Sequence, residues 1–384
     1  MPEALATDPG RIACLFSTSG HSGVDRLAQH LLPALAARGY RVDLLKVRRH
    51  GPDLNAAAAT TRSLRIIDLG SRHTYACIPG IVRYLQRARP GVMLSDKDRV
   101  NRTALLARRL SGVPTRLFLR SGTTLSVDLA SRGAGQRRLQ RWSVGHLYRY
   151  ADGVLVPSQG AADDLVAFAA LSPTLIRVVP TPVVPEALFD KPPAAPDHPW
   201  FHDAGVPLIL GVGELSRRKD FATLLRGFAQ LRADRPCRLM ILGEGGERDA
   251  LLAEADALGV GDDVSLPGFV PKPYAYLAHA DLFALTSRWE GMPLVLVEAL
   301  ALGTPVVATD CQSGPREVLA DGRFGPLVPV GDAPALAAAM AAILAAPPDT
   351  DGLRDAARPY AVEAAVSAYL AAMGLPPVAP VVCP

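Results

Sequence analysis

Short apolar runs alternate with longer segments of helical periodicity along most of this chain. The runs Arg11–Ser17 and Leu208–Val212 are predominantly apolar, as strands are when both faces of a parallel sheet are covered. The segments Asp25–Gly39 and Phe221–Leu231 instead repeat apolar residues at helical spacing. Strands that alternate with helices predict an α/β protein made of doubly wound parallel sheets.

The alternation is interrupted by the proline-rich stretch Pro180–Pro199, which is typical of a linker. Because the strand–helix pattern restarts after it, we expect two Rossmann-like domains that face each other across a cleft. The expected bounds are residues 1–185 for an N-terminal domain and 186–352 for a C-terminal domain. Residues 353–384 should form a helix that packs back toward the N-terminal domain, followed by a loose tail.

Composition excludes several classes of protein. Apolar residues make up 49% of the chain and charged residues 20%, which indicates a globular protein rather than a disordered one. No apolar run reaches membrane-spanning length, and the first residues do not resemble a secretory signal, so we expect a cytoplasmic protein. The five cysteines never occur at metal-binding spacing, and we interpret them as small buried residues in a reducing compartment.

Charge is distributed unevenly between the two halves. Residues 1–190 contain 26 Lys and Arg against 14 Asp and Glu, a net charge of +12, whereas residues 191–384 carry −8. A basic first half suggests an anionic partner, such as a lipid phosphate, the inner face of the plasma membrane or a nucleic acid. The alternative is an arginine-rich composition without any partner. No recognition motif supports nucleic acid, and we do not expect it as a partner.

The most basic helical segment is Arg132–Arg149. Its arginines interleave with Leu139, Trp142, Leu147 and Tyr148. Such a segment could lie on anionic lipid as an amphipathic helix. It could equally pack its apolar stripe inward and solvate its arginines, which is the more common behaviour of an amphipathic helix.

The most informative stretch is Ser287–Asp310. Glu290 and Glu298 stand eight residues apart, separated by a Gly-Met-Pro turn and the start of an apolar helix that Pro293 should begin and Gly303 should end. Ligands of open α/β sheets bind beyond the carboxyl ends of the strands, at helix N-termini. Eight helical residues span ~12 Å, which suits polar anchors for the sugar and the ribose of a nucleotide sugar around its diphosphate.

Two short patterns in the first domain are less specific indicators of a binding site. The loop Thr18–Gly23 follows a strand and could place backbone N–H groups around an anion, but its spacing is not that of a dinucleotide fingerprint. Asp96-Lys97-Asp98 matches the Asp-x-Asp pattern of metal-dependent sugar transferases of another fold. Three-residue patterns arise often by chance, and we interpret this one as unrelated to metal binding.

These motifs together resemble a known family. Glu290-x7-Glu298, preceded by Ser287-x-x-Glu-Gly and followed by Ala301-x-Gly-Thr-Pro-Val-Val-Ala-Thr-Asp, is similar to the family 4 retaining glycosyltransferases of the GT-B fold. The segment Ser313–Glu317 is similar to members that act in polysaccharide, lipid-linked oligosaccharide and protein-glycan assembly. The resemblance spans nearly the whole chain and is strongest from Leu208 to Leu319.

The resemblance implies roles for individual residues. Glu290 would bind hydroxyls of the donor sugar, and Lys219 would neutralise the leaving diphosphate, with Arg217 or Arg218 as a further source of positive charge. Glu298 would bind the ribose, and the backbone at Phe269 and Val270 would contact the nucleobase. The residues implied in donor binding are Gly213, Arg217, Phe269, Val270, Gly291, Met292, Leu294, Val295 and Glu298.

The chain departs from the family pattern at three places. Glu214 stands where the family usually has Arg, and Pro293 replaces a frequent Gly. Arg120 falls where many members have a His at the end of a first-domain strand, and it could bind sugar or phosphate but not act as a base. His21 and His146 we interpret as structural. On the acceptor side we expect Gly20, His21, Ser22 and Gly23.

The resemblance implies a retaining, metal-independent transferase of hexosyl or N-acetylhexosaminyl type. The expected donor is a UDP-sugar or another nucleoside-diphosphate sugar, with no further cofactor. The expected acceptor is a glycan, a lipid-phosphate-linked glycan or a small molecule, with peripheral contact between the basic domain and an anionic membrane. The alternative is a GT-B protein that binds a nucleotide sugar without transferring it, or one with another activity such as epimerisation.

Overall fold

The computed structural model describes residues 6–17, 23–47, 54, 63–71, 73–130, 132–203 and 205–376. The chain forms two compact units, one of residues 1–183 with 362–384 and the other of residues 184–361. The C-terminal segment is shared between them, because α15 (Thr350–Ala357) packs on α12 (Leu294–Ala301) in the second unit, whereas α16 (Val362–Ala372) belongs to the first.

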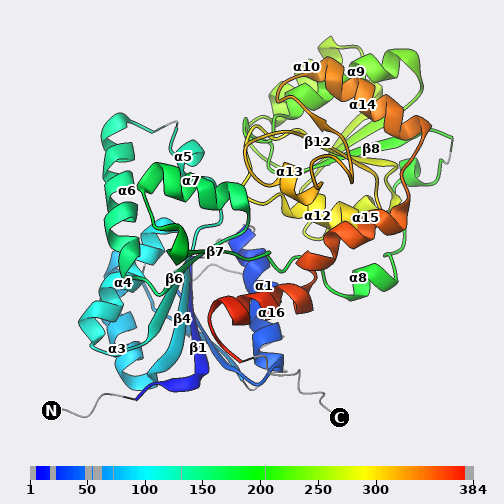
Figure 1. Cartoon of the computed structure of the whole chain (residues 1–384). Coiled ribbons are helices and arrows are strands. Elements are labelled where there is room, and N and C mark those ends of the chain that lie inside the picture. Colours follow the sequence, from blue (N-terminus) through cyan, green and yellow to red (C-terminus); the bar gives the residue numbers. More distant parts are fainter. Residues whose placement is uncertain are drawn as a thin grey trace. The chain divides into compact units, whose positions relative to one another are not determined.

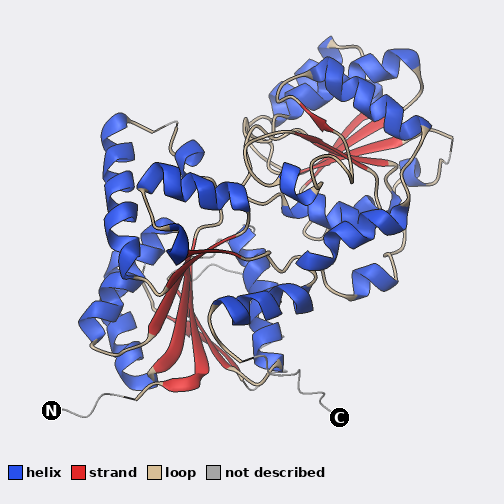
Figure 2. Cartoon of the chain, in the orientation of Figure 1, coloured by secondary structure: helices blue, strands red, loops and turns tan. Residues whose placement is uncertain are grey.

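The first unit contains a seven-stranded parallel sheet in the order β3-β2-β1-β4-β5-β6-β7. Helices cover both faces of this sheet (Figure 2). The strands are β1 (Asp8–Phe16), β2 (Arg41–Lys46), β3 (Leu64–Asp68), β4 (Pro90–Asp96), β5 (Arg116–Arg120), β6 (Gly153–Val156) and β7 (Ile176–Val178). The helices are α1 (Gly23–Ala37), α3 (Ile78–Ala88), α4 (Asp98–Ser111), α5 (Leu125–Asp128), α6 (Ala134–Leu147), α7 (Gln159–Ala169) and α16.

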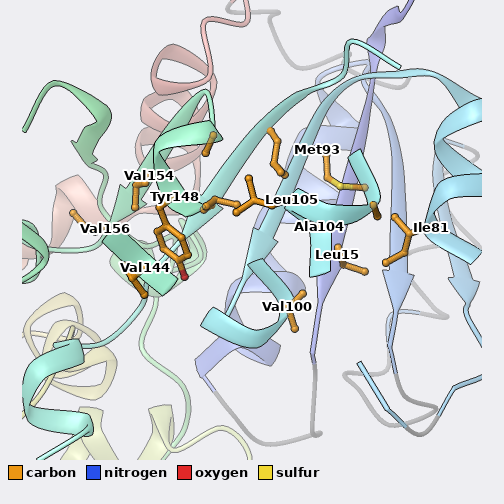
Figure 3. Close-up of a cluster of buried hydrophobic side chains, with 14 of the residues drawn as sticks. Leu15, Ile81, Met93, Val100, Ala104, Leu105, Val144, Tyr148, Val154 and Val156 are labelled. Carbon is orange, nitrogen blue, oxygen red and sulfur yellow. The ribbon is translucent and has the colours of Figure 1, made fainter. Parts of the chain in front are cut away.

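Successive side chains of the central strand β1 belong to two different hydrophobic clusters. Ala13 and Leu15 of β1 belong to one buried cluster with residues of α3, α4 and α6, whereas Ile12 and Cys14 belong to a second cluster with residues of α1 and α16. Figure 3 shows part of the first cluster, in which Leu15 and Met93 of the sheet lie near side chains of α3 and α4. This alternation explains why the strands are apolar throughout, since both faces are buried.

The second unit contains a six-stranded parallel sheet in the order β10-β9-β8-β11-β12-β13. Figure 1 labels β8 and β12 of this sheet. The chain places β9 and β10 on one side of β8 and then β11, β12 and β13 on the other side. The switch point of the sheet therefore lies between the carboxyl ends of β8 and β11. The strands are β8 (Leu208–Val212), β9 (Arg238–Leu242), β10 (Val264–Gly268), β11 (Leu282–Leu285), β12 (Val306–Thr309) and β13 (Leu327–Val328). The helices are α8 (Ala187–Asp190), α9 (Phe221–Asp234), α10 (Arg248–Ala257), α11 (Tyr274–His279), α12, α13 (Pro315–Val318), α14 (Ala333–Ala345) and α15.

The structure confirms the predicted α/β fold with two Rossmann-like parallel-sheet units. Pro293 takes the cap position before α12 rather than its first helical position, and Gly303 follows the helix with a φ of 78°. The inward packing expected for Leu139 and Trp142 is wrong, since these α6 side chains are 61% and 54% exposed. Among the described residues, no helix is both long and apolar enough to cross a membrane.

Candidate functional site

The candidate site in the second unit is built on two loops at neighbouring strand ends. The loop 213–220 connects β8 to α9, and the loop 286–293 connects β11 to α12. Since β8 and β11 pair in parallel, both loops leave the same edge of the sheet. This is the switch point at which open α/β sheets bind their ligands.

Four side chains from these loops form what we call the Glu290 cluster: Ser287, Glu290, Arg218 and Lys219. Lys219 Nζ donates to Glu290 Oε1 over 2.6 Å, and Arg218 donates to Glu290 Oε2 over 3.0 Å. Ser287 Oγ also donates to Oε1, over 2.8 Å. Burial acts to raise the pKa of Glu290, but the charges of Lys219 and Arg218 and the hydrogen bonds outweigh it and lower that pKa.

Hydrogen bonds and an ion pair connect the two loops to each other. Thr286 Oγ1 donates to the Lys219 carbonyl over 2.9 Å, and the Arg288 N–H donates to the Arg218 carbonyl over 2.8 Å. The Arg288 guanidinium pairs with Asp220, a residue with a left-handed φ of 51°. The cluster therefore sits on a constrained backbone, which favours a preorganised charge arrangement.

Three glycines allow the loops to approach closely. A Cβ at Gly213 would lie 2.9 Å from Lys219 Cε, so the lysine side chain runs directly over this glycine. A Cβ at Gly243 would lie 1.8 Å from the Gly213 carbonyl oxygen, and one at Gly245 would lie 2.3 Å from the Leu215 oxygen. Sequence reasoning identified Gly213 but missed Gly243 and Gly245. Their signal was the glycine-rich run that directly follows β9.

The start of α12 is shaped by the chain after β12. Ser313 Oγ donates to the Gly291 carbonyl over 3.3 Å, and a Cβ at Gly314 would lie 2.6 Å from Pro293 Cδ. The cap residue Pro293 makes no side-chain cap hydrogen bond, and the first two N–H groups of α12 belong to Leu294 and Val295. Such groups can bind an anion when it approaches the helix N-terminus.

The other predicted donor residues differ in accessibility. Gly291, Met292 and Val295 are buried, Leu294 and Val270 are partly buried, and Arg217 is exposed. Phe269 is 46% exposed and follows β10, and its loop is connected to the others because Gly243 N–H donates to the Gly268 carbonyl over 2.8 Å. Glu298 is 0% exposed on α12. A ribose could therefore reach this carboxylate only after the atoms that cover it moved aside.

Arg120 lies in the first unit, at the carboxyl end of β5, and it is buried. Its three guanidinium nitrogens donate to Asp96 Oδ2 over 2.6 Å, Tyr369 Oη over 3.0 Å and Thr181 Oγ1 over 3.1 Å. The structure thus places Arg120 in a closed hydrogen-bond network that joins β4, β5 and α16. No pattern in the sequence pointed to the Tyr369 contact.

The remaining predictions for the first domain concern the loop Gly20–Gly23 and the Asp-x-Asp pattern. Gly20, His21 and Ser22 lie outside the described residues, and Gly23 begins α1. Asp96 pairs with Arg120 and Asp98 with Arg102, so both carboxylates of the Asp-x-Asp pattern have cationic partners. Within the described ranges, no three His, Cys, Asp or Glu side chains gather as a metal site would require.

Comparison with known families matches both units. Residues 22–182 match the glycosyl transferase 4-like domain, and residues 197–361 match the glycosyl transferases group 1 family. Among curated proteins, a Campylobacter jejuni N-acetylgalactosamine-N,N'-diacetylbacillosaminyl-diphospho-undecaprenol 4-alpha-N-acetylgalactosaminyltransferase is 36% identical over 233 residues. The match covers 61% of this chain and 61% of that relative. The Erwinia amylovora amylovoran biosynthesis glycosyltransferase AmsD is 26% identical, with 80% of this chain and 82% of the relative covered.

Solved structures show the same fold. Anabaena HepE in complex with UDP superposes with a TM-score of 0.77 at 17% identity, covering 95% of this chain and 99% of that one. The lipopolysaccharide outer core galactosyltransferase WaaB superposes with a TM-score of 0.72 at 20% identity, also over 95% and 99%. With residues 22–182 and 197–361 each matched by a glycosyltransferase model, this chain belongs to the glycosyltransferases of the GT-B fold, with a glycosyl transferase 4-like domain followed by a group 1 domain.

Proposed function

We propose that the protein is a retaining glycosyltransferase that uses a UDP-sugar as donor. The observation that carries this proposal is the Glu290 cluster, in which one carboxylate and two cations meet at the switch point of the sheet. A carboxylate can accept hydrogen bonds from sugar hydroxyls, and cations can neutralise a diphosphate. The structural similarity to HepE, which was solved with UDP, supports the choice of nucleotide.

In the proposed reaction the donor takes over the partners of Glu290. The diphosphate would attract Lys219 and Arg218, and the sugar hydroxyls would then donate to the Glu290 carboxylate. As the glycosidic bond breaks, negative charge grows on the leaving phosphate, and the two cations with the first turn of α12 stabilise it. The same phosphate would assist removal of the acceptor proton on one face of the sugar, which retains the anomeric configuration.

The proposed acceptor is a glycan carried on a lipid diphosphate, and the donor sugar is a hexose or N-acetylhexosamine. The Campylobacter relative is named for a diphospho-undecaprenol acceptor and for transfer of N-acetylgalactosamine, which supports both choices. The net charge of +12 over residues 1–190 suits an anionic acceptor and peripheral contact with an anionic membrane. No metal takes part in this scheme, since Lys219 and Arg218 supply the positive charge.

UDP release from a panel of UDP-sugars, with undecaprenyl-diphosphate glycans as acceptors, tests the proposal. We expect UDP release that requires Glu290 and Lys219, and a product whose anomeric configuration matches the donor by NMR. Glu254→Ala serves as a control, because this carboxylate pairs with Arg226 elsewhere in the second unit. Inverted product, or donor binding without UDP release in any combination, would contradict the proposal.

A second candidate is a protein that binds a nucleotide sugar without transferring it. Its specific support is Glu214, an exposed carboxylate in the loop that carries Lys219. An acid at this place weakens diphosphate binding by like-charge repulsion unless it turns away. Glu214→Arg distinguishes the two, since faster UDP release in this variant is expected of a transferase with a weakened clamp.

A further inference from the structure

Helix α6 of the first unit has an exposed side that carries large apolar residues among arginines. Every residue from Gly133 to Leu139 is exposed, so the first turns of this helix are solvated all around. Farther along, Val144 and Tyr148 are buried in the core, and these residues fix which side of α6 faces inward. With the inward side fixed, the opposite side can be assigned residue by residue.

Helical spacing places Trp142 near the middle of the outward side. At 3.6 residues per turn, Arg138 lies to one side of it, and Leu139 and His146 lie to the other. Arg149 follows α6 in the 3-10 turn Tyr148–Tyr150 and is also exposed. Leu139 is 61% exposed and Trp142 54%. We call these five residues the α6 outer face. Trp142 thus exposes about half of its surface at the centre of this face.

The tryptophan is held in place rather than loose. Its indole stacks on the His146 ring with centroids 5.0 Å apart and an interplanar angle of 24°. His146 is oriented in turn by its Nδ1, which lies 2.9 Å from the Trp142 carbonyl oxygen. An ordered, exposed aromatic side chain loses less conformational entropy when a surface covers it.

The neighbouring helix α4 also presents apolar side chains to solvent. Leu106 is 46% exposed and Leu110 is 58% exposed, with the exposed Arg109 beside them on the helix. The two helices pack together, and Gln140 of α6 donates to the Asp98 carboxylate at the start of α4. Two adjacent helices of one unit therefore each carry outward leucines among arginines.

The charge of this region is mostly positive. Residues 98–152, which span α4 through α6, contain 11 arginines and three acidic residues, Asp98, Asp128 and Asp152. Three of the arginines are paired, Arg102 with Asp98, Arg108 with Asp152 and Arg120 with Asp96. The helices thus combine exposed apolar groups with an excess of positive charge.

We propose that the α6 outer face, together with Leu106 and Leu110, docks on an anionic phospholipid bilayer. Trp at the level of the lipid headgroups, leucines below it and arginines beside it match the chemistry of such an interface. A polyanion without an apolar phase, such as RNA, would satisfy the arginines but leave Leu106, Leu110 and Leu139 in water. This inference deepens the proposed function, because it names the surface through which a lipid-linked acceptor would be approached.

Vesicle flotation and tryptophan fluorescence test the docking surface. We expect the full chain to float with phosphatidylglycerol-rich vesicles and to remain unbound with phosphatidylcholine vesicles. The emission should shift to the blue on binding, and this shift should disappear in Trp142→Phe, which leaves Trp200 and Trp289 as the remaining indoles.

Matched variants separate this face from general charge attraction. Arg138→Gln with Arg149→Gln should weaken vesicle binding roughly thirtyfold, whereas Arg83→Gln with Arg87→Gln, which removes equal charge from exposed positions of α3, should weaken it far less. Trp142→Ala should weaken binding about tenfold, and Tyr75→Ala, an equally exposed aromatic of the same unit, should not.

Three results would overturn the proposal. These are no binding to phosphatidylglycerol vesicles, equal losses in the α6 and α3 charge variants, and an unchanged blue shift in Trp142→Phe. UDP release with a water-soluble acceptor keeps the two proposals apart. If the α6 variants lose vesicle binding and retain this activity, docking is supported independently, and a chain that binds vesicles without any UDP release would contradict the proposed function alone.

Discussion

Two carboxylate–cation pairs stand at the carboxyl ends of parallel strands, one in each unit. Asp96 and Arg120 in the first unit and Glu290 and Lys219 in the second are both joined by a 2.6 Å contact. Their side chains are comparably buried, with exposed fractions of 2% and 7% in the first pair and of 5% and 10% in the second. Distance and burial alone therefore do not distinguish a functional pair from a structural one.

The partners around each pair do distinguish them. Each of the three guanidinium nitrogens of Arg120 donates to a protein atom, of Asp96, Tyr369 or Thr181, and the arginine side chain is only 7% exposed. The second oxygen of Glu290 instead accepts from Arg218, whose side chain is 35% exposed. The first arrangement is sealed, whereas the second has a member that reaches solvent and can exchange its partner for a ligand.

Arg120→Ala should have the largest effect on stability. It leaves the Asp96 carboxylate buried without its cation, and breaking a buried pair in this way costs about 3–5 kcal/mol. Chemical denaturation measures the loss, and hydrogen exchange at β4 and β5 assigns it to the first unit. Asp96→Leu combined with Arg120→Met removes both charges and should recover much of the stability. A loss below about 1 kcal/mol in the single variant would show that the pair is not sealed.

Lys219→Ala should instead mainly affect activity. We expect a decrease of about 10²–10³-fold in UDP release, since a charge aimed at the leaving group is removed. The free energy of unfolding should change less than in Arg120→Ala, because Arg218 and Ser287 still bond to Glu290. Partial rescue by Lys219→Arg would confirm that charge is what matters, and a Lys219→Ala enzyme with full activity would remove Lys219 from the site.

Gly213→Ala tests how accurately the lysine must be placed. The new Cβ would lie 2.9 Å from Lys219 Cε and would displace the ammonium group, with an expected decrease in activity of about tenfold to hundredfold. Gly246→Ala is the matched control, because a Cβ there would meet no atom within 4 Å. Equal activity of the two variants would indicate that the position of Lys219 is not critical.

Asp43 provides a smaller, pH-dependent test of a sealed carboxylate. Burial acts to raise its pKa, but hydrogen bonds from Arg65, Tyr84 and Arg11 outweigh this and lower the pKa below its ordinary value of 3.8. A lowered pKa means that the carboxylate stabilises the fold above the ordinary value and that this contribution disappears as the pH falls through the lowered pKa.

Denaturation at a series of acidic pH values measures this contribution. Wild type should lose stability as the pH drops below about 4, and Asp43→Asn should show a flatter dependence over the same range. The variant should also be less stable at neutral pH, because Arg11 and Arg65 lose their shared partner. Parallel pH profiles would show that Asp43 titrates alike in the folded and unfolded chain.

Much of the second-unit site was predictable because its parts are local. Strands and loops follow from short apolar runs, and parallel pairing brings loop ends to one edge, so Lys219 and Glu290 could be expected to meet. The Arg120 contact was not predictable, since Tyr369 lies 249 residues away along the chain. The outward orientation of Trp142 was hidden too, because a stripe of apolar residues among arginines predicts inward packing as readily as exposure.

The assignment of α16 to the first unit has a consequence for how the protein is made. Val366, Tyr369, Leu370 and Met373 complete the core around α1 and β1, yet they are translated after the whole of the second unit. During synthesis, all residues of the second unit would therefore be available for folding before the last residues of the first unit. Domains usually complete their folding in order from the N-terminus, and this chain would complete its two units in the opposite order. Until residues 362–373 have left the ribosome, Arg120 lacks the hydroxyl of Tyr369 as a hydrogen-bond partner, and the core around α1 and β1 is incomplete.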